Sequence, residues 1–272
     1  KNEFPDRFIS FGIAEQNMFG IAAGMSTVEG VVPFVSTFAV FATERACNQV
    51  SISIAYPKNN VKINGAYAGI PTGKAGATHQ SIQDLAIMRS MPNMVVIAPA
   101  DAREVREVVR FAADYIGPVY IRTTRHETPV FLPEDYRFQL GRSLLLKDGD
   151  DITLIGTGVM TFLALESALE LEKSGIDARV VHMSCLKPFD DEAAVKAARE
   201  TAGIITMENH SIIGGLGGAV AEAVCEKCPT RVIRVGFPDV YGESGDDYEI
   251  FKKMGLHVDN VKNLVLKLLR ER

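Results

Sequence analysis

Short apolar runs alternate with stretches of helical periodicity through the first half of the chain. The runs that predict strands are RFISFG (7–12), VVPFVS (31–36), VKINGAY (61–67), MVVIAP (94–99) and PVYIRT (118–123). Helical periodicity covers residues 15–28, 38–54, 81–90 and 101–114. Strands that alternate with helices are typical of a parallel sheet with crossover helices. We therefore expect an α/β domain over residues 1–135, with helix N-caps at Ser36 or Thr37 and at Asp101.

The same alternation begins again in the second half. Residues 124–148 carry two prolines and scattered charges, which indicates a connecting arm. Strands are then predicted at 151–158, 178–183, 202–209 and 231–237, and helices at 161–174, 190–200, 217–227, 246–254 and 259–271. The predicted fold class is α/β, with two parallel-sheet domains over residues 1–135 and 136–272.

Composition narrows the class of protein further. The 272 residues carry a net charge of −5 and no basic block, which argues against a nucleic-acid partner. The apolar runs are far shorter than the roughly 20 residues that span a membrane, and KNEFPDRF is not a signal peptide. We expect a cytoplasmic protein whose cysteines (47, 185, 225 and 228) are reduced thiols, with translation starting upstream of Lys1.

The stretch FISFGIAEQNMFGIAAGM (residues 8–25) places one carboxylate, that of Glu15, at the first turn of a helix of small and apolar residues. A glutamate in this position either answers the helix dipole or transfers protons in a site. The stretch alone favours the helix dipole, and the rest of the chain reverses that preference.

Two glycine-rich stretches in the second half carry weak signals. IGTGVMTFLAL (155–165) resembles a pyrophosphate turn, but Thr161 replaces the third glycine and His182 ends the next strand without an acid. A plain turn is therefore favoured there. ENHSIIGGLGG (208–218) suits either an anion bound by backbone amides or a tight turn, and we favour the turn. The role of His210 stays open.

A longer glycine-rich loop lies in the first half. AYAGIPTGKAGATHQS (66–81) follows a predicted strand, and α/β folds bind ligands at the carboxyl ends of parallel strands. Its His79 is as consistent with substrate contact as with a solvated loop. Phe38 and Phe41 lie one helical turn apart near another strand end, a spacing that is by itself more typical of core packing.

Taken in order, six motifs resemble the carboxyl half of a transketolase, a thiamine-diphosphate enzyme. They are FGIAEQNM, PFVSTFAVF, AGIPTGKAGATHQ, SMPNMVVIAPAD, PVYIRTTRHETP and ENHSIIGGLGG, and they run over nearly the whole chain. The first half resembles the pyrimidine-binding domain, and the second half resembles the transketolase C-terminal domain. The implied reaction moves a two-carbon ketol unit from a ketose donor to an aldose acceptor.

The resemblance also implies roles for individual residues. Glu15 matches the glutamate that bonds N1′ of the cofactor's pyrimidine, and Phe38 and Phe41 match the aromatic cradle for that ring. His79 matches a histidine that contacts the donor's reacting hydroxyl and carbonyl. Arg125 matches an arginine for the substrate phosphate, where a planar guanidinium suits a bidentate contact.

The match to the family is incomplete in a way that implies a partner. The chain lacks the family's metal-diphosphate motif, so Mg²⁺ and the diphosphate would be bound mainly by another chain. That partner would be an N-terminal transketolase subunit, with two copies of each chain in a heterotetramer. The family's first strand of the pyrimidine-binding domain would lie before Lys1.

Three departures affect the substrate. Lys74 and Ala75 stand where the family has Glu and Asp, Tyr67 replaces a phosphate-binding histidine, and Glu44 replaces a third cradle aromatic. We therefore expect the substrate to be a non-standard sugar or sugar phosphate. Tyr67 would line its binding site, and Lys74 would contact its anionic group. Two other readings stay open. One is a 2-oxo acid dehydrogenase β subunit or a deoxyxylulose-phosphate-synthase-like enzyme, and the other is a non-catalytic regulatory half.

Overall fold

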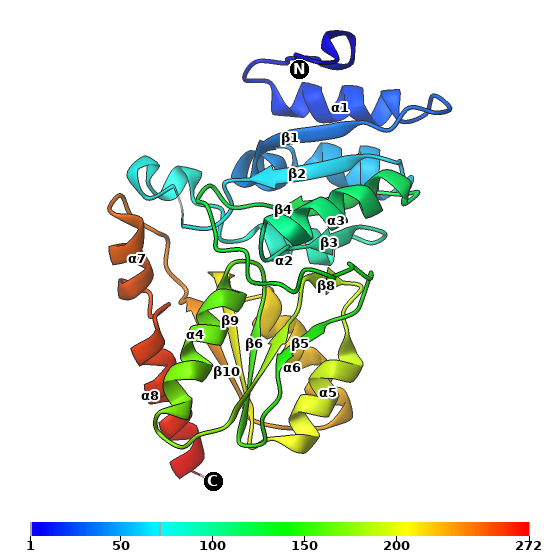
Figure 1. Cartoon of the computed structure of the whole chain (residues 1–272). Coiled ribbons are helices and arrows are strands. Elements are labelled where there is room, and N and C mark those ends of the chain that lie inside the picture. Colours follow the sequence, from blue (N-terminus) through cyan, green and yellow to red (C-terminus); the bar gives the residue numbers. More distant parts are fainter. Residues whose placement is uncertain (1, 71, 272) are drawn as a thin grey trace.

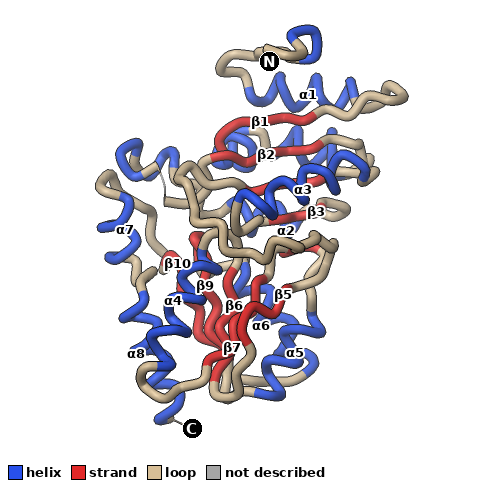
Figure 2. Tube along the Cα trace, viewed as in Figure 1, coloured by secondary structure: helices blue, strands red, loops and turns tan. Residues whose placement is uncertain are grey.

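The computed structural model describes residues 2–70 and 72–271 and contains two α/β units that lie end to end (Figure 1). The helices of the second unit cover its sheet on both sides, with α4 and α8 on one side and α5 and α6 on the other (Figure 2). None of the helices in the described part of the chain is long and apolar enough to cross a bilayer.

The first unit contains the N-terminal segment and a five-stranded sheet, of which four strands come from the first half of the chain. Its strands are β1 (Phe34–Phe38), β2 (Lys62–Ala66), β3 (Val95–Ile97) and β4 (Val119–Arg122). Its helices are α1 (Glu15–Met25), α2 (Asp84–Ser90) and α3 (Ala102–Asp114), with short 3-10 turns η1 (Pro5–Arg7), η4 (Gly73–Ala75) and η5 (Ala77–His79). The predicted helix at 38–54 contains two π-helical segments, η2 (Phe41–Arg45) and η3 (Gln49–Ala55).

The second unit contains the remaining elements. Its strands are β5 (Leu144–Lys147), β6 (Ile152–Gly156), β7 (Ala178–His182), β8 (Cys185–Lys187), β9 (Ile204–Ser211) and β10 (Val232–Phe237). Its helices are α4 (Met160–Glu172), α5 (Asp191–Glu200), α6 (Leu216–Lys227), α7 (Asp247–Lys253) and α8 (Val258–Arg270).

Each sheet is parallel apart from one of its edge strands. The orders are β1-β2-β4-β3-β8 and β10-β9-β6-β7-β5, and β8 and β5 are the antiparallel edge strands. The expected α/β class is confirmed, with the correction that each sheet is mixed. Strand β8 comes from the second half of the chain but belongs to the first sheet alone, so the second half supplies the edge strand of the first sheet. The boundary at 135/136 stays a prediction.

Three sequence-based expectations about elements are wrong. Residues 8–14 form no regular element, so the predicted strand at 7–12 is absent, and Ile13 is 91% exposed rather than buried. An apolar run forms a strand only where a neighbouring strand can bond its backbone. Ser36 and Thr37 are not N-caps, because both lie inside β1. The arm at 124–148 is not wholly irregular, because it ends in β5.

The junction between the units is built from buried ion pairs. Arg122 at the end of β4 bonds both oxygens of Asp84 at 2.8 and 3.2 Å, and it also donates to the carbonyl of Asn209 at 2.8 Å. Glu104 of α3 bonds His182 of β7 at 2.7 Å. These charges are buried but paired, which is the condition under which charges are tolerated in a core. The junction therefore fixes the first sheet against the second.

Candidate active site

The carboxyl ends of three neighbouring parallel strands form one edge of the first sheet. Phe38 is the last residue of β1, Tyr67 follows β2 directly, and Arg125 lies three residues after β4. Because β1, β2 and β4 are adjacent and parallel, their ends meet at the same place, where open α/β sheets bind ligands.

The aromatic side chains at this edge contact one another. The Phe38 and Phe41 rings are stacked, with centroids 5.6 Å apart and an interplanar angle of 14°. The Tyr67 ring meets Phe38 edge-on at 4.5 Å, and the His79 ring meets Phe41 edge-on at 5.5 Å. The guanidinium of Arg125 lies 5.6 Å from the Tyr67 centroid. We call Phe38, Phe41, Tyr67 and His79 the aromatic cluster.

Local backbone geometry presents these rings. Tyr67 has φ +56°, in the left-handed region that non-glycine residues rarely adopt. Strained residues of this kind gather at functional sites. Phe41 starts the π-helical segment η2, and short π-helical insertions are also frequent at such sites. Phe38 and Phe41 are half-buried and stand outside the buried core, so their surroundings fit a binding surface better than core packing.

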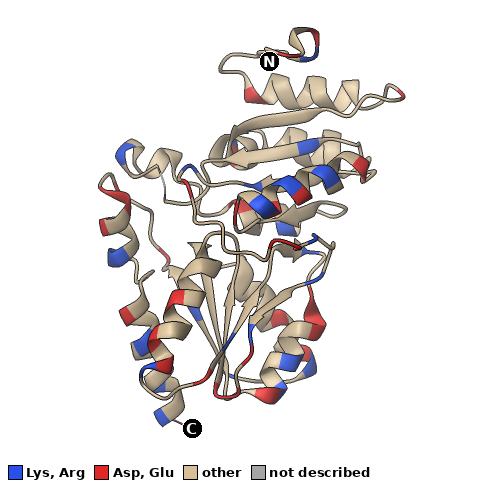
Figure 3. Ribbon diagram, in the orientation of Figure 1, with Lys and Arg blue, Asp and Glu red and all other residues tan. Residues whose placement is uncertain are grey.

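Glu15 is the first residue of α1, and Figure 3 shows it as the only charge on that helix. Its side chain is 8% exposed. The N-cap residue, Ala14, makes no side-chain bond to the helix end, so Glu15 also supplies the negative charge that favours a helix N-terminus. The helix-dipole role and the site role are compatible at this position.

Arg45 joins Glu15 to the aromatic cluster, and the sequence reasoning missed it. Its Nη1 donates to the Glu15 carboxylate at 3.3 Å, and its guanidinium lies 4.4 Å from the Phe41 centroid. The sequence spacing could have indicated this contact, because Arg45 follows Phe41 by four residues and residues four apart lie on the same face of a helix.

Two predicted substrate residues lie apart from each other. Arg125 reaches the cluster through Tyr67, whereas the exposed Lys74 lies in η4 and forms no ion pair with another described residue. Its neighbour Gly73 is instead bonded to Asp247 of α7 at 2.6 Å. The loop that carries Lys74 is thus anchored to the second unit.

Glu44, at the third cradle position, lines a cavity of about 290 Å³ with Gln80, Gln83 and Tyr241. Burial and the nearby charge of Asp84 raise the pKa of the Glu44 carboxyl. The amide oxygen of the buried Gln80 has no hydrogen-bond partner in the described structure. Polar groups thus face the space where the family has an aromatic ring.

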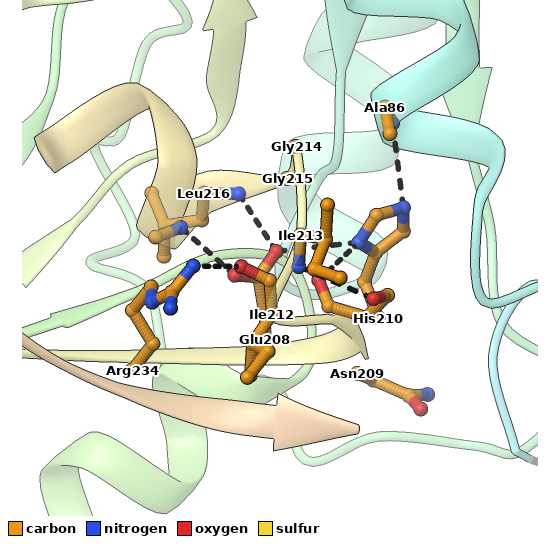
Figure 4. A network of polar contacts seen from close by, with 12 residues as sticks. Ala86, Glu208, Asn209, His210, Ile212, Ile213, Gly214, Gly215, Leu216 and Arg234 are labelled. Atoms are coloured by element: carbon orange, nitrogen blue, oxygen red, sulfur yellow. Dashed lines mark hydrogen bonds and ion pairs between the residues drawn. The ribbon is translucent and has the colours of Figure 1, made fainter. Parts of the chain in front are cut away.

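The glycine-rich loop of the second unit binds a carboxylate from its own chain (Figure 4). Glu208 of β9 accepts from the backbone amides of Leu216 and Gly217 at 2.7 and 2.8 Å, at the start of α6. A side chain at Gly215 would collide with that carboxylate, so glycine is required there. The loop is therefore the tight turn we favoured, with an internal anion at the helix N-terminus.

His210, beside this loop, has hydrogen-bond partners in both units. In Figure 4, His210 lies between the two units, with Nε2 accepting from the amide of Ala86 at 3.3 Å. Its Nδ1 donates to the carbonyl of Ser211 at 2.7 Å.

His182 of β7 also has structural partners, because it bonds Thr161 at 2.7 Å as well as Glu104. The two positions that broke the pyrophosphate fingerprint thus bond each other, which fits a plain turn.

Comparison with known proteins gives consistent matches along the chain. Residues 1–130 match the pyrimidine-binding domain of transketolase, and residues 141–261 match the transketolase C-terminal domain. A putative transketolase C-terminal section from Methanocaldococcus jannaschii is 42% identical over 99% of this chain and 85% of that protein. One of the subunits of an apulose-4-phosphate transketolase from Phocaeicola vulgatus is 41% identical over 99% of this chain and 86% of that protein.

A solved structure shares both the fold and the split organisation. It is described as a split-gene transketolase in an inactive β4 tetramer, and it is 50% identical with a TM-score of 0.93. The match covers 99% of this chain and 86% of that one. The chain therefore belongs to the thiamine-diphosphate-dependent transketolase family and corresponds to the C-terminal part of a split transketolase.

Proposed function

We propose that this chain is the pyrimidine-binding half of an enzyme that transfers a two-carbon ketol unit from a ketose to an aldose. The observation that carries the proposal is the position of Glu15, buried at the start of α1 and linked through Arg45 to the stacked Phe38–Phe41 pair. In this family such a carboxylate acts on the pyrimidine of thiamine diphosphate.

The residues at the sheet edge fit that cofactor. The planar guanidinium of Arg45 already stacks on Phe41 while donating to Glu15, so the site suits a flat nitrogen-containing group that hydrogen-bonds in its plane. Thiamine diphosphate, when bound, supplies the nucleophilic carbon that ketol transfer requires. Glu15 would hold a proton at pyrimidine N1′, and Phe38 and Phe41 would support the ring.

The other cluster residues would act on the substrate. His79 lies beside both phenylalanines, where an imidazole can exchange a proton with a reacting hydroxyl. Arg125 and Tyr67 together present a guanidinium and a phenol at the cluster margin, which suits a phosphate or another anionic group. Lys74 would add a second cation from η4.

The proposal includes a partner chain. An N-terminal transketolase subunit would bind Mg²⁺ and the diphosphate, in a cytoplasmic complex with two copies of each chain. The names of the relatives support this organisation, because they describe a C-terminal section, one subunit of a transketolase and a split-gene product. We also keep the two domains at 1–135 and 136–272 as part of the proposal.

The substrate is proposed to differ from the standard pentose phosphates. Ala75 offers no carboxylate to a sugar hydroxyl, and Tyr67 offers a phenol where the family offers imidazole. A relative that is 41% identical is named for apulose 4-phosphate, which supports a non-standard sugar for chains of this type.

The test is reconstitution with the partner subunit, thiamine diphosphate and Mg²⁺, followed by assay on a panel of ketoses with aldose acceptors. Glu15→Gln is expected to lower ketol transfer about 10²–10⁴-fold, the usual contribution of a positioned proton-transfer group. Glu29→Gln, an exposed glutamate beyond the same helix, is the matched control and should retain activity.

The alternative functions give different results in the same assay. Release of CO₂ from a 2-oxo acid without ketol transfer would favour the dehydrogenase or synthase reading. No turnover with any donor would favour a regulatory half. Ordinary turnover of xylulose 5-phosphate with ribose 5-phosphate would contradict the non-standard substrate.

A further inference from the structure

Arg45 occupies a position that combines two different contacts. Its guanidinium lies 4.4 Å from the Phe41 centroid, and its Nη1 donates to Glu15 at 3.3 Å. The Glu15 side chain is 8% exposed, whereas the Arg45 side chain is 48% exposed. The arginine thus enters from solvent and places its planar head between a buried carboxylate and an aromatic face.

These two contacts are the ones that an aminopyrimidine would make. A guanidinium and an aminopyrimidine are both flat, delocalised nitrogen groups that stack on an aromatic ring and hydrogen-bond in their plane; the guanidinium donates to the carboxylate, whereas the ring nitrogen would share a proton with it. We infer that Arg45 is an internal occupant of the pyrimidine subsite, which stays in place in the free chain and must leave before the cofactor's ring binds. This inference rests on the proposed function.

The local helix geometry explains why the residue at position 45 can do this. In η2 the amide of Ala46 donates to the carbonyl of Phe41 at 3.1 Å, so the segment makes the wider π-helical turn. A side chain four residues after Phe41 then lies on the same face of the helix. A lysine would provide a point charge without a flat surface to stack, so arginine is the residue that can mimic the ring.

The energetics suit an exchangeable contact. A half-exposed ion pair contributes little to stability, so its arginine loses little when it moves into water. A buried carboxylate left without any donor is much less favourable. Arg45 therefore keeps Glu15 paired while the chain is free, and its departure is compensated once a ring nitrogen shares a proton with Glu15. The contact lowers cofactor affinity severalfold and does not block it.

The first arm of the test uses the free chain without cofactor. Arg45→Met keeps the length of the side chain and removes the flat donor. We expect it to lower the melting temperature by about 2–4 °C, and to have almost no effect in a Glu15→Met background. Additive effects of the two substitutions would show that the side chains do not interact, and would overturn the inference.

The second arm measures binding of 4-amino-2-methylpyrimidine, a neutral ring without the diphosphate, by ligand-observed NMR titration. Arg45→Met is expected to bind the ring about two- to fivefold more tightly than the native chain, as follows from losing an ion pair of up to about 1 kcal/mol. Arg110→Met, which removes a 71% exposed arginine from α3, should bind like the native chain.

Unchanged affinity, weaker affinity or no saturable binding by the Arg45→Met chain would each overturn the inference. Failure of the proposed function has a different signature. In that case the reconstituted complex would cleave no ketose, while the coupling between Arg45 and Glu15 in the free chain would persist.

Discussion

Lys62 begins β2 with its side chain buried inside the first unit. Its ammonium donates to the carbonyls of Tyr115 and Gly117 at 2.6 and 2.7 Å, and it lies 5.4 Å from the Tyr115 ring centroid. Burial lowers the pKa of this lysine to about 8. The ammonium closes the turn between α3 and β4 without an anionic partner among these contacts.

The stability of the protein should therefore depend on pH through Lys62. In the unfolded chain the lysine keeps its proton up to about pH 10.4, whereas the folded chain releases it above about 8. Between these values the unfolded state binds more protons, so stability rises with pH. The rise is at most about 3 kcal/mol and should be absent from Lys62→Met, which urea unfolding across this range would measure. Parallel pH curves for the two proteins would contradict it.

The candidate site was partly predictable at the residue scale. Glu15, Phe38 and His79 stand in motifs whose order predicts their roles; the structure brings Phe38 and His79 together at one sheet edge and links Glu15 to them through Arg45. Arg45 was not found because a charged residue on a helix is usually solvated, and only the fold shows that its head turns back onto Phe41. Lys74 was named for its charge, which does not determine where an exposed loop directs a side chain.

Among the elements, α3 shows how one side chain can fix both a helix and a loop. Asp101 accepts from the amides of Arg103 and Glu104 with one oxygen, as its N-cap position predicts. With the other oxygen it accepts from the amides of Phe131 and Leu132 at 2.9 and 3.0 Å. The arm between the units is thus attached to the start of α3.

The substitution Asp101→Ala should therefore lower the free energy of unfolding by more than the loss of an ordinary N-cap does. We expect a loss of about 2–4 kcal/mol in unfolding free energy, because a cap is removed and two further buried amides lose their acceptor. Urea denaturation measures it, with Asp114→Ala at the other end of α3 as the control. Asp114 is exposed, and its loss should change stability by less than about 0.5 kcal/mol. Equal effects of the two substitutions would refute the double role.

The helices were more predictable than the strands. The five helices of the second unit begin and end within two residues of their predicted positions, because their apolar spacing is sustained over several turns. Strands β5 and β8 were missed because each has three or four residues and forms only where an existing sheet edge accepts it. The run at 7–12 failed for the opposite reason, since it is apolar but lacks a strand's surroundings.

Across the whole molecule, buried pairs connect the two units. Glu104 accepts from the hydroxyl of Tyr136 at 2.6 Å and from the amide of Ala100 at 2.6 Å, in addition to its pair with His182. Burial raises its pKa, but the His182 charge and these bonds outweigh burial and hold the pKa of Glu104 below its usual value. The residue thus stays ionised in the junction.

Glu104→Gln should weaken this junction. Removing one charge of a buried pair typically costs about 3–5 kcal/mol, which urea unfolding near neutral pH would detect. The native protein gains stability from Glu104 above the ordinary carboxyl pKa and loses it as pH falls through the lower folded value. The variant should therefore lose less stability on acidification. Glu107→Gln, in a surface pair on the same helix, should behave like the native protein.

The position of β8 at the edge of the first sheet also has a consequence for the synthesis of the protein. Because β8 (185–187) borders β3, a ribosome must make the chain as far as residue 187 before the first sheet can reach its full width. A polypeptide released after residue 135 would present β3 as an open edge, which is a template for aggregation. Expression of the N-terminal unit alone is therefore a poor route to a soluble fragment. Laboratory dissection of this chain should keep the two units together, because a cut after β8 would in turn leave β6 without its neighbour β9.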